Sequence, residues 1–247
     1  EMSDVCIKRK IRNRLLDAGE NIFVQSDDKC IDKCKSLKAR AEANEAFGAE
    51  LKKGKKADAQ RGYEIACKEW MDVRSFGQVF AFKGSDLSLG IRGPVSVQPA
   101  FSVDPIDITS MQITKSVNSE DKEGKSSDTM GMKHRVDFGV YILKGSINVQ
   151  LSEKTGFTEE DAEKIKEAIR TLFVNDSSSA RPDGSMVMHK LYWWKHNCKI
   201  GQYSSHKVHN SIEIKKKEGV RNPRKIEDYE IICHELPGLA VEEYEGL

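Results

Sequence analysis

The chain has 247 residues, a length that buries a real core and fits either one elaborated domain or two small ones. Its 40 Lys and Arg residues balance 39 Asp and Glu residues, so the net charge of +1 does not by itself indicate a nucleic-acid-binding protein. Charged residues make up 32% of the chain and the mean hydropathy is −0.57, which argues against a membrane protein. We expect no signal peptide and no membrane partner. The six cysteines include no C-x-x-C pair, so we expect reduced thiols and a cytoplasmic location.

The first predicted element is a helix with a basic surface. Ile7, Ile11 and Leu15 recur at helical spacing and form its apolar stripe, with Ser3 as a candidate N-cap. Few acidic residues lie near the basic ones, whereas an ordinary surface helix interleaves the two signs. The pattern fits a solvated face or a phosphate-binding face. Three side chains on this helix are candidate phosphate contacts: Lys8, Arg9 and Arg12.

Residues 25–71 are predicted to form an inserted helical lobe. Helix formers dominate residues 39–51, and the sequence Lys-Lys-Gly-Lys-Lys at 52–56 predicts a basic turn after them. This turn is either a solvated tip or a contact for nucleic acid.

Strands and turns are predicted from residue 72 onward. Residues 73–82 and 90–97 have strand character, and Pro94 is expected near a strand start. No Gly-Lys-Ser/Thr closes the glycine-containing segments, so they are not a P-loop. Arg74 and Arg92 each lie beside small residues that permit the close approach of a ligand. Each arginine is therefore either a ligand contact or an internal ion-pair partner.

Residues 106–138 are predicted to form a long β-hairpin. Residues 106–108 and 111–115 alternate as a strand does, and the polar stretch 119–129 is expected to be a mobile tip. Gly131 then precedes three adjacent donor side chains, Lys133, His134 and Arg135, with strand character resuming by residue 136. These donors suit phosphate or a base edge, and a solvated basic turn is the alternative reading.

The remaining sequence predicts one clear helix and several strands. Thr158 begins a helix with a capping-box-like start and an apolar face at residues 165, 168, 169, 172 and 173. Arg181 lies in the loop that follows. The aromatic strand predicted at 186–194 is either core, a subunit interface or a stacking platform for bases. Short strands are predicted at 212–214 and 229–232, and the acidic residues at 242–245 are expected to be solvated.

Catalytic and metal-binding patterns are weak in this sequence. His196, Cys198, His206 and His209 do not have the spacing of an ordinary zinc finger, and no nucleophile-elbow or H-E-x-x-H pattern occurs. We therefore predict no catalytic residue, no metal and no cofactor.

Several motifs in series resemble one known family. They are Asp-Val-Cys-Ile-Lys-Arg-Lys-Ile-Arg-Asn at 4–13, Asp-Val-Arg-Ser-Phe-Gly at 72–77, Arg-Gly-Pro-Val at 92–95, and Ser-Val-Asp-Pro-Ile at 102–106. They continue with Thr-Met-Gly-Met-Lys-His at 129–134, Thr-Gly-Phe at 155–157 and Ser-Ala-Arg at 179–181. Together they resemble the repeating backbone subunit of type I CRISPR interference complexes (Cascade), in its type I-C form.

The resemblance implies an α+β fold with a ferredoxin-like (RRM-like) palm. It implies one domain over residues 1–247, with a helical finger insertion at about 25–71 and a hairpin thumb at about 106–138. Family members polymerise head-to-tail along CRISPR RNA, present the guide to target DNA and leave cutting to a recruited nuclease-helicase. The RNA-binding residues implied here are Lys8, Arg9, Arg12, Arg74, Arg92, Met132, Lys133, His134, Arg135 and Arg181. Other Cascade subunits are expected partners, and no enzymatic activity is expected.

The resemblance also implies a central strand and an Asn-Pro-Asn-Gly-Asp-like loop ahead of the first helix. We expect both to be missing from this sequence. Two other functions remain open. One is an RRM-like endoribonuclease that processes guide RNA, with a general base such as His134. The other is an interaction module outside CRISPR systems whose hairpin binds protein.

Overall fold

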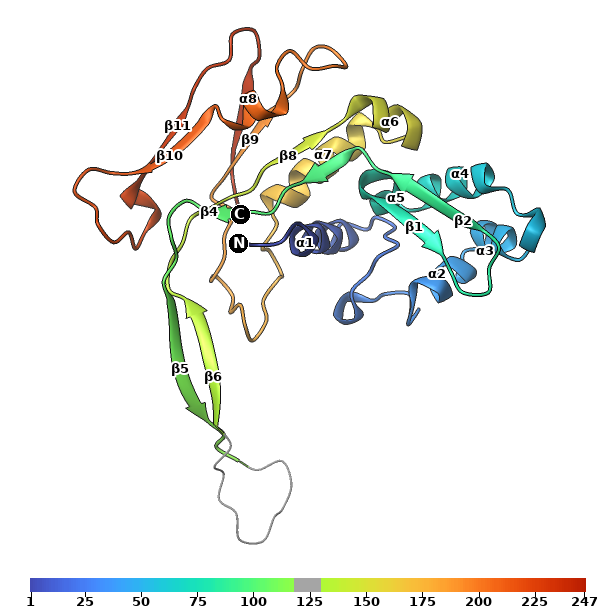
Figure 1. The fold of residues 1–247 in the computed structure, drawn as a ribbon, viewed down its shortest axis with the longest axis horizontal. Coiled ribbons are helices and arrows are strands. Elements are labelled where there is room, and N and C mark those ends of the chain that lie inside the picture. Colours follow the sequence, from blue (N-terminus) through green and yellow to red (C-terminus); the bar gives the residue numbers. More distant parts are fainter. Residues whose placement is uncertain (118–129) are drawn as a thin grey trace. The chain divides into compact units, whose positions relative to one another are not determined.

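The computed structural model describes residues 1–117 and 130–247, and Figure 1 shows the elements in chain order. Contacts divide the chain into two compact units. Unit 1 comprises residues 1, 100–142 and 212–234, and unit 2 comprises residues 2–99, 143–211 and 235–247. Helices and short antiparallel sheets occur together, which confirms the α+β class. The tip expected at 119–129 lies outside the described residues.

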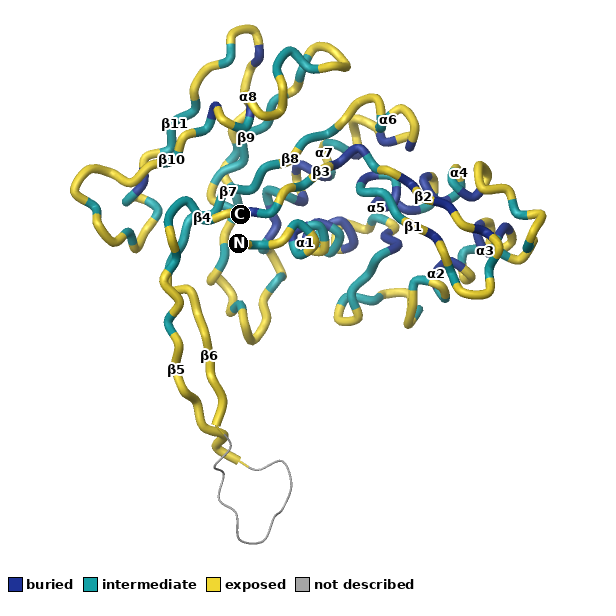
Figure 2. Tube along the Cα trace, in the orientation of Figure 1, coloured by how far each residue is buried: buried dark blue, intermediate teal, exposed yellow. Residues whose placement is uncertain are grey.

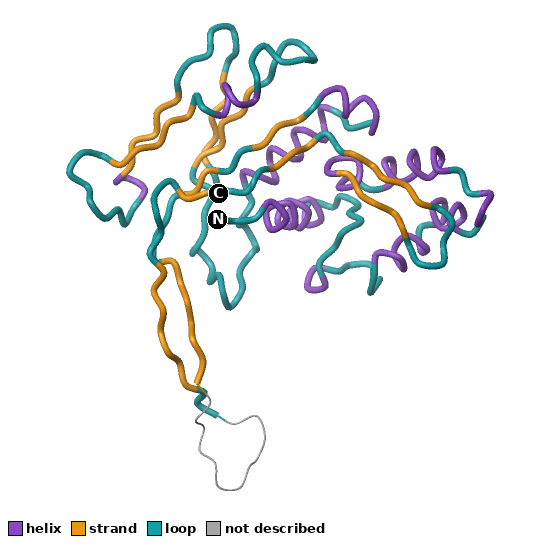
Figure 3. The backbone as a smooth tube through the Cα atoms, viewed as in Figure 1, coloured by secondary structure: helices purple, strands orange, loops and turns teal. Residues whose placement is uncertain are grey.

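The helices of unit 2 account for most of the helical structure (Figure 3). They are α1 (Asp4–Asp17), η1 (Asp27–Lys29), α2 (Leu37–Ala43), α3 (Glu45–Leu51), η2 (Gly54–Lys56), α4 (Ala59–Glu69), α5 (Met71–Phe76), α6 (Val149–Thr155), α7 (Glu159–Arg170) and α8 (Ser205–His209). None of the helices in the described part of the chain is long and apolar enough to cross a membrane.

The strands pair two by two. Unit 2 pairs β1 (Gly77–Ala81) with β2 (Ser88–Arg92), β3 (Val95–Val97) with β8 (Gly145–Ile147), and β9 (Lys190–Trp194) with β12 (Val241–Glu245). Unit 1 pairs β4 (Phe101–Ser102) with β7 (Tyr141–Ile142), β5 (Ile108–Thr114) with β6 (Met130–Val136), and β10 (Ile212–Lys216) with β11 (Tyr229–Cys233), which follows η3 (Ile226–Asp228). Among the described residues no sheet exceeds two strands, so the ferredoxin-like sheet is not confirmed.

The two predicted helix starts are confirmed. The Ser3 side chain accepts a hydrogen bond from Cys6 N at the start of α1. The stripe residues Ile7, Ile11 and Leu15 are buried. Thr158 and Asp161 form a reciprocal capping box at the start of α7. Local capping and helical periodicity therefore fix both helices.

An aromatic core holds the predicted helical lobe together. Phe80 on β1 lies 4.8 Å from Phe47 on α3 and 5.0 Å from Phe23, measured between ring centroids. Trp70 lies 4.7 Å from Phe23, and all four side chains are buried. Asn44 divides α2 from α3, because its side chain accepts from Phe47 N and starts a new helix. The helical character predicted for residues 25–71 is confirmed.

Two local predictions are wrong, and a third is confirmed. Residues 73–76 are helical rather than extended, because α5 is fixed by tertiary contacts: the buried Asp72 carboxylate accepts from Phe23 N and Val24 N. Strand β6 already spans Met130–Val136, so the basic donors lie inside the strand and not in a turn before it. Residues 242–245 lie in β12, where Glu242, Glu243 and Glu245 are exposed, so the prediction that these acidic residues are solvated is confirmed. Ion pairs of Glu242 with Lys166 and of Glu243 with Lys190 neutralise two of its carboxylates.

Candidate nucleic-acid interface

The β5–β6 hairpin carries the central group of predicted RNA contacts. Its register runs from Ile108 opposite Val136 to Thr114 opposite Met130. Every residue of β6 is exposed, and only Thr109 of β5 is partly covered, as Figure 2 shows along both strands. The hairpin therefore has two free faces for a ligand or partner.

The register separates the predicted contacts onto opposite faces. Side chains alternate along a strand, and directly opposed residues share a face. Lys133 and Arg135 lie on one face, which we call the cationic face, and Met132 and His134 lie on the other, the uncharged face. The cationic face consists of Thr109, Met111, Ile113, Gly131, Lys133 and Arg135. The uncharged face consists of Ile108, Ser110, Gln112, Thr114, Met130, Met132, His134 and Val136.

Side-chain contacts differ between the two faces. On the uncharged face, His134 Nδ1 lies 2.8 Å from Ser110 Oγ. On the cationic side, Arg135 Nε donates to Asp137 Oδ1 at 2.7 Å, and Thr109 Oγ1 donates to Asp137 Oδ2 at 2.9 Å. The Thr109 hydrogen bond and the charge of Arg135 hold the pKa of Asp137 below its usual value. Lys133 forms no ion pair with any residue in the described ranges, so its charge is available to a ligand.

The base of the hairpin is fixed by a second hairpin of unit 1. Tyr229, the first residue of β11, donates from Oη to Asp104 Oδ2 at 2.7 Å, and Lys216 Nζ lies 3.1 Å from Asp104 Oδ1. The Tyr229 ring also lies 6.5 Å from that of Phe138, between centroids. Burial and the bond to Asp104 raise the pKa of Tyr229 to about 12. Asp104 is thus engaged in structural contacts.

Three of the predicted arginines in unit 2 are ion-paired. Arg74 donates Nε and Nη2 to the buried Asp161 carboxylate at 2.9 and 2.7 Å. Arg12 Nε donates to Asp72 Oδ2 at 2.9 Å and lies over the Phe76 ring. Arg181 Nε lies 3.4 Å from an oxygen of Asp176, a longer contact, and this Nε has no hydrogen-bond partner among the described residues. Their RNA contacts remain predictions.

The other basic candidates in unit 2 are less engaged. Lys8 pairs with Asp4 at 3.1 Å, while Arg9 and Arg92 are exposed. The single-sign charge of α1 was one argument for phosphate binding. The fold nevertheless supplies carboxylates to this helix: Asp72 pairs with Arg12, and Asp176 pairs with the buried Lys10.

A basic loop between β10 and β11 was not among the residues predicted to bind RNA. Residues 215–225 contain six Lys and Arg residues and one acidic residue, Glu218. The charge run itself was the available signal. The weak zinc pattern finds no structural counterpart: no cluster of three or more His, Cys, Asp or Glu side chains suited to a metal occurs among residues 1–117 and 130–247.

Comparison with known proteins gives a family. No curated protein matches the chain. One similar solved structure is described as "CRISPR RNA-guided surveillance complex, pre-nicking", with 19% identity, a TM-score of 0.35, and coverage of 72% of this chain and 59% of that chain. A likeness at this level does not establish a shared fold. The model of the family "CRISPR-associated protein Cas7" matches residues 1–234. This confirms the family resemblance seen in the sequence: the chain belongs to the Cas7 family of CRISPR-associated proteins.

Proposed function

We propose that this chain is a CRISPR RNA-binding backbone subunit of a Cascade interference complex, of type I-C. Family membership and the exposed cationic face of the β5–β6 hairpin support this proposal. Each copy of a backbone subunit meets different guide bases, so its contacts must not depend on sequence. Lys133 and Arg135 suit that requirement, since phosphate contacts position a nucleic acid without reading its bases.

The uncharged face has a complementary role in the proposal. Methionine and valine side chains offer an apolar surface to an unstacked base or to the next subunit, and His134 adds a ring that can stack. The hairpin acts as the thumb, which kinks the RNA and flips out a base. Residues 25–71 act as the finger lobe of a single ferredoxin-like domain, with α1 and α7 in its palm. Of the basic residues in unit 2, Arg9 and Arg92 are the RNA contacts best supported by their exposure.

The subunits associate head-to-tail along the RNA. Such an interface does not close on itself, so the length of RNA and the capping subunits set the length of the filament. The filament presents guide bases to target DNA, joins other Cascade subunits and recruits a separate nuclease-helicase. The subunit itself is non-catalytic. In support, His134 shares its face with no carboxylate and no second cation, groups that usually assist a general base.

Light scattering on RNA of two lengths tests this proposal. The protein is mixed with single-stranded RNA of guide length and of half that length, and masses are measured after size exclusion. The mass of bound protein is expected to double with RNA length, with the RNA intact on a gel. The variant Lys133→Glu/Arg135→Glu should remain folded but fail to assemble. Cleaved RNA would favour the endoribonuclease function. Absence of RNA binding by the wild-type protein would contradict the proposal.

A further inference from the structure

The loop between β10 and β11 carries several basic side chains that form no ion pair with another described residue. Lys215 and Lys216 have acidic partners, Glu230 at 3.7 Å and Asp104 at 3.1 Å. Four further cations of the loop are exposed and form no ion pair with another residue of the described ranges: Lys217, Arg221, Arg224 and Lys225. Cations that lack a carboxylate partner are available to neutralise phosphate.

The carboxylate of Asp228, just after this loop, is engaged by the backbone. Asp228 Oδ2 accepts from Arg224 N at 2.7 Å and from Lys225 N at 3.2 Å. Lys217 N in turn donates to Asp228 O at 2.9 Å and closes the base of the loop. These bonds fix the backbone on both sides and leave the basic side chains directed to solvent.

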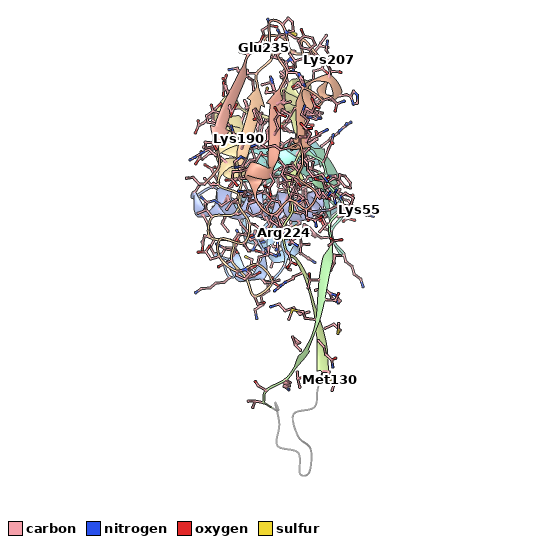
Figure 4. The ribbon with its side chains drawn as sticks, turned by 90° about the vertical axis from the view of Figure 1, so that its left-hand side faces the viewer. Lys55, Met130, Lys190, Lys207, Arg224 and Glu235 are labelled. Carbon is pink, nitrogen blue, oxygen red and sulfur yellow. The ribbon has the colours of Figure 1, made fainter. Side chains whose placement is uncertain are left out.

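The loop lies beside the base of the β5–β6 hairpin, within unit 1. Tyr229 follows η3 directly and is bonded to Asp104, and its ring packs near Phe138. Asp137, the residue before Phe138, has its pKa lowered by the Thr109 hydrogen bond and by the charges of Arg135 and Arg224. Figure 4 shows Arg224 near the start of the hairpin and Met130 at its far end. Asp137 is therefore bonded to Arg135 of one hairpin, and the charge of Arg224 in the other hairpin acts on the same carboxylate.

We propose that the β10–β11 loop is a second phosphate-binding element that continues the cationic face of the β5–β6 hairpin. One RNA strand is held by Lys133 and Arg135 from one hairpin and by Arg221 and Arg224 from the other. The inference rests on the proposed function, because it concerns the same RNA. Arginine suits the task, since its planar guanidinium binds phosphate with two parallel hydrogen bonds.

Asp137 has a defined effect in this arrangement. Its carboxylate is bonded to Arg135 and therefore competes with phosphate for that guanidinium. Asp137→Asn keeps a similar side-chain shape and an acceptor for Thr109, but removes the negative charge. RNA binding should therefore become tighter, roughly threefold or more, with greater salt sensitivity. A purely structural role for Asp137 predicts weaker binding or none.

Binding of a labelled single-stranded RNA of mixed sequence, measured across a salt series, tests the inference. For single strands the slope of log K against log salt changes by about 0.7 for each phosphate contact. Arg221→Glu/Arg224→Glu should flatten the slope by about 1.4 and raise Kd roughly tenfold or more. Lys83→Glu/Lys154→Glu is the matched control, because it makes the same charge change at two exposed lysines of unit 2. Circular dichroism melts verify that each variant is folded.

The outcomes separate the two proposals. If the hairpin variant Lys133→Glu/Arg135→Glu loses binding while the loop variant behaves like the control, the loop inference is overturned and the proposed function stands. If Asp137→Asn weakens binding in a folded protein, the loop inference is also overturned. If the wild-type protein does not bind RNA at any salt concentration, the proposed function fails and the inference with it.

Discussion

Arg74 donates two hydrogen bonds to Asp161, which is also the capping-box residue of α7. The pair joins α5 to α7 across a sequence separation of 87 residues, and the Asp161 side chain is only 4% exposed. Burial works against the charge of Asp161. The bonds from Arg74 and Thr158 N outweigh that effect and lower its pKa. The Asp161 carboxylate therefore stays charged in a buried position because it is paired with the Arg74 guanidinium.

We predict that Arg74→Met destabilises the protein by about 3 kcal/mol, because it leaves a buried carboxylate without its partner. Urea denaturation measures the change. Arg92→Met is the matched control, since Arg92 is exposed and should change stability by less than about 0.5 kcal/mol. A loss below about 1 kcal/mol for Arg74→Met would contradict the structural role and make Arg74 a better RNA candidate.

The two faces of the hairpin should differ in their salt dependence. Lys133→Gln/Arg135→Gln removes two cations and should flatten the slope of log K against log salt for RNA by about 1.4. Met130→Ser/Met132→Ser changes the uncharged face and should weaken binding with an unaltered slope. Fluorescence anisotropy at several salt concentrations measures both. Equal slopes for the two variants would contradict the prediction that only the cationic face binds phosphate.

Unit 1 should lose stability in alkali. The folded-state pKa of Tyr229 is raised to about 12, against an unfolded value near 10, about the value of a free tyrosine. The bond to Asp104 therefore contributes fully below pH ~10 and is lost as the pH rises from ~10 to ~12. Tyr229→Phe should remove this dependence and cost roughly 1–2 kcal/mol at neutral pH. Thermal melts and the phenolate absorbance of both proteins, followed from pH 7 to 12, measure it. Identical pH profiles would contradict the prediction.

The helical lobe should depend on its aromatic core. Phe80 is fully buried between Phe23 and Phe47, so Phe80→Ala should cost about 3–5 kcal/mol. Val79→Ala is the control on the same strand, because Val79 is 68% exposed and should have little effect. Urea denaturation compares the two variants. Similar stability for both would show that β1 is not packed as described.

Local signals predicted part of this fold. The capping box at Thr158, the apolar stripe of α1 and the alternation in residues 106–108 and 111–115 each depend on neighbours within a few positions, so the sequence alone identifies the two helix starts and most of β5. Residues 73–76 look extended by composition, yet contacts made by Asp72 with Phe23 N and Val24 N fix them as a helix. Such partners have no local signature.

The sequence names candidate RNA-binding residues, but it does not predict how they are arranged. Lys133, His134 and Arg135 were expected to work together before a strand. Their placement within β6 puts His134 on the face opposite the two cations. The partners of Arg12 and Arg74 lie 60 and 87 residues away, so no local pattern revealed that both are ion-paired. The cations at 215–225 were visible as a charge run, but only the contacts of Tyr229 place them beside the hairpin.

Photo-crosslinking tests directly whether the β5–β6 hairpin holds the RNA. Guide-length RNA with photoreactive nucleotides is bound to the full chain and irradiated, and the crosslinked peptides are identified by mass spectrometry. We predict adducts on residues 130–136 of β6, which disappear in high salt and in Lys133→Glu/Arg135→Glu. Adducts that avoid β6 and persist in that variant would contradict the claim that this hairpin holds the RNA.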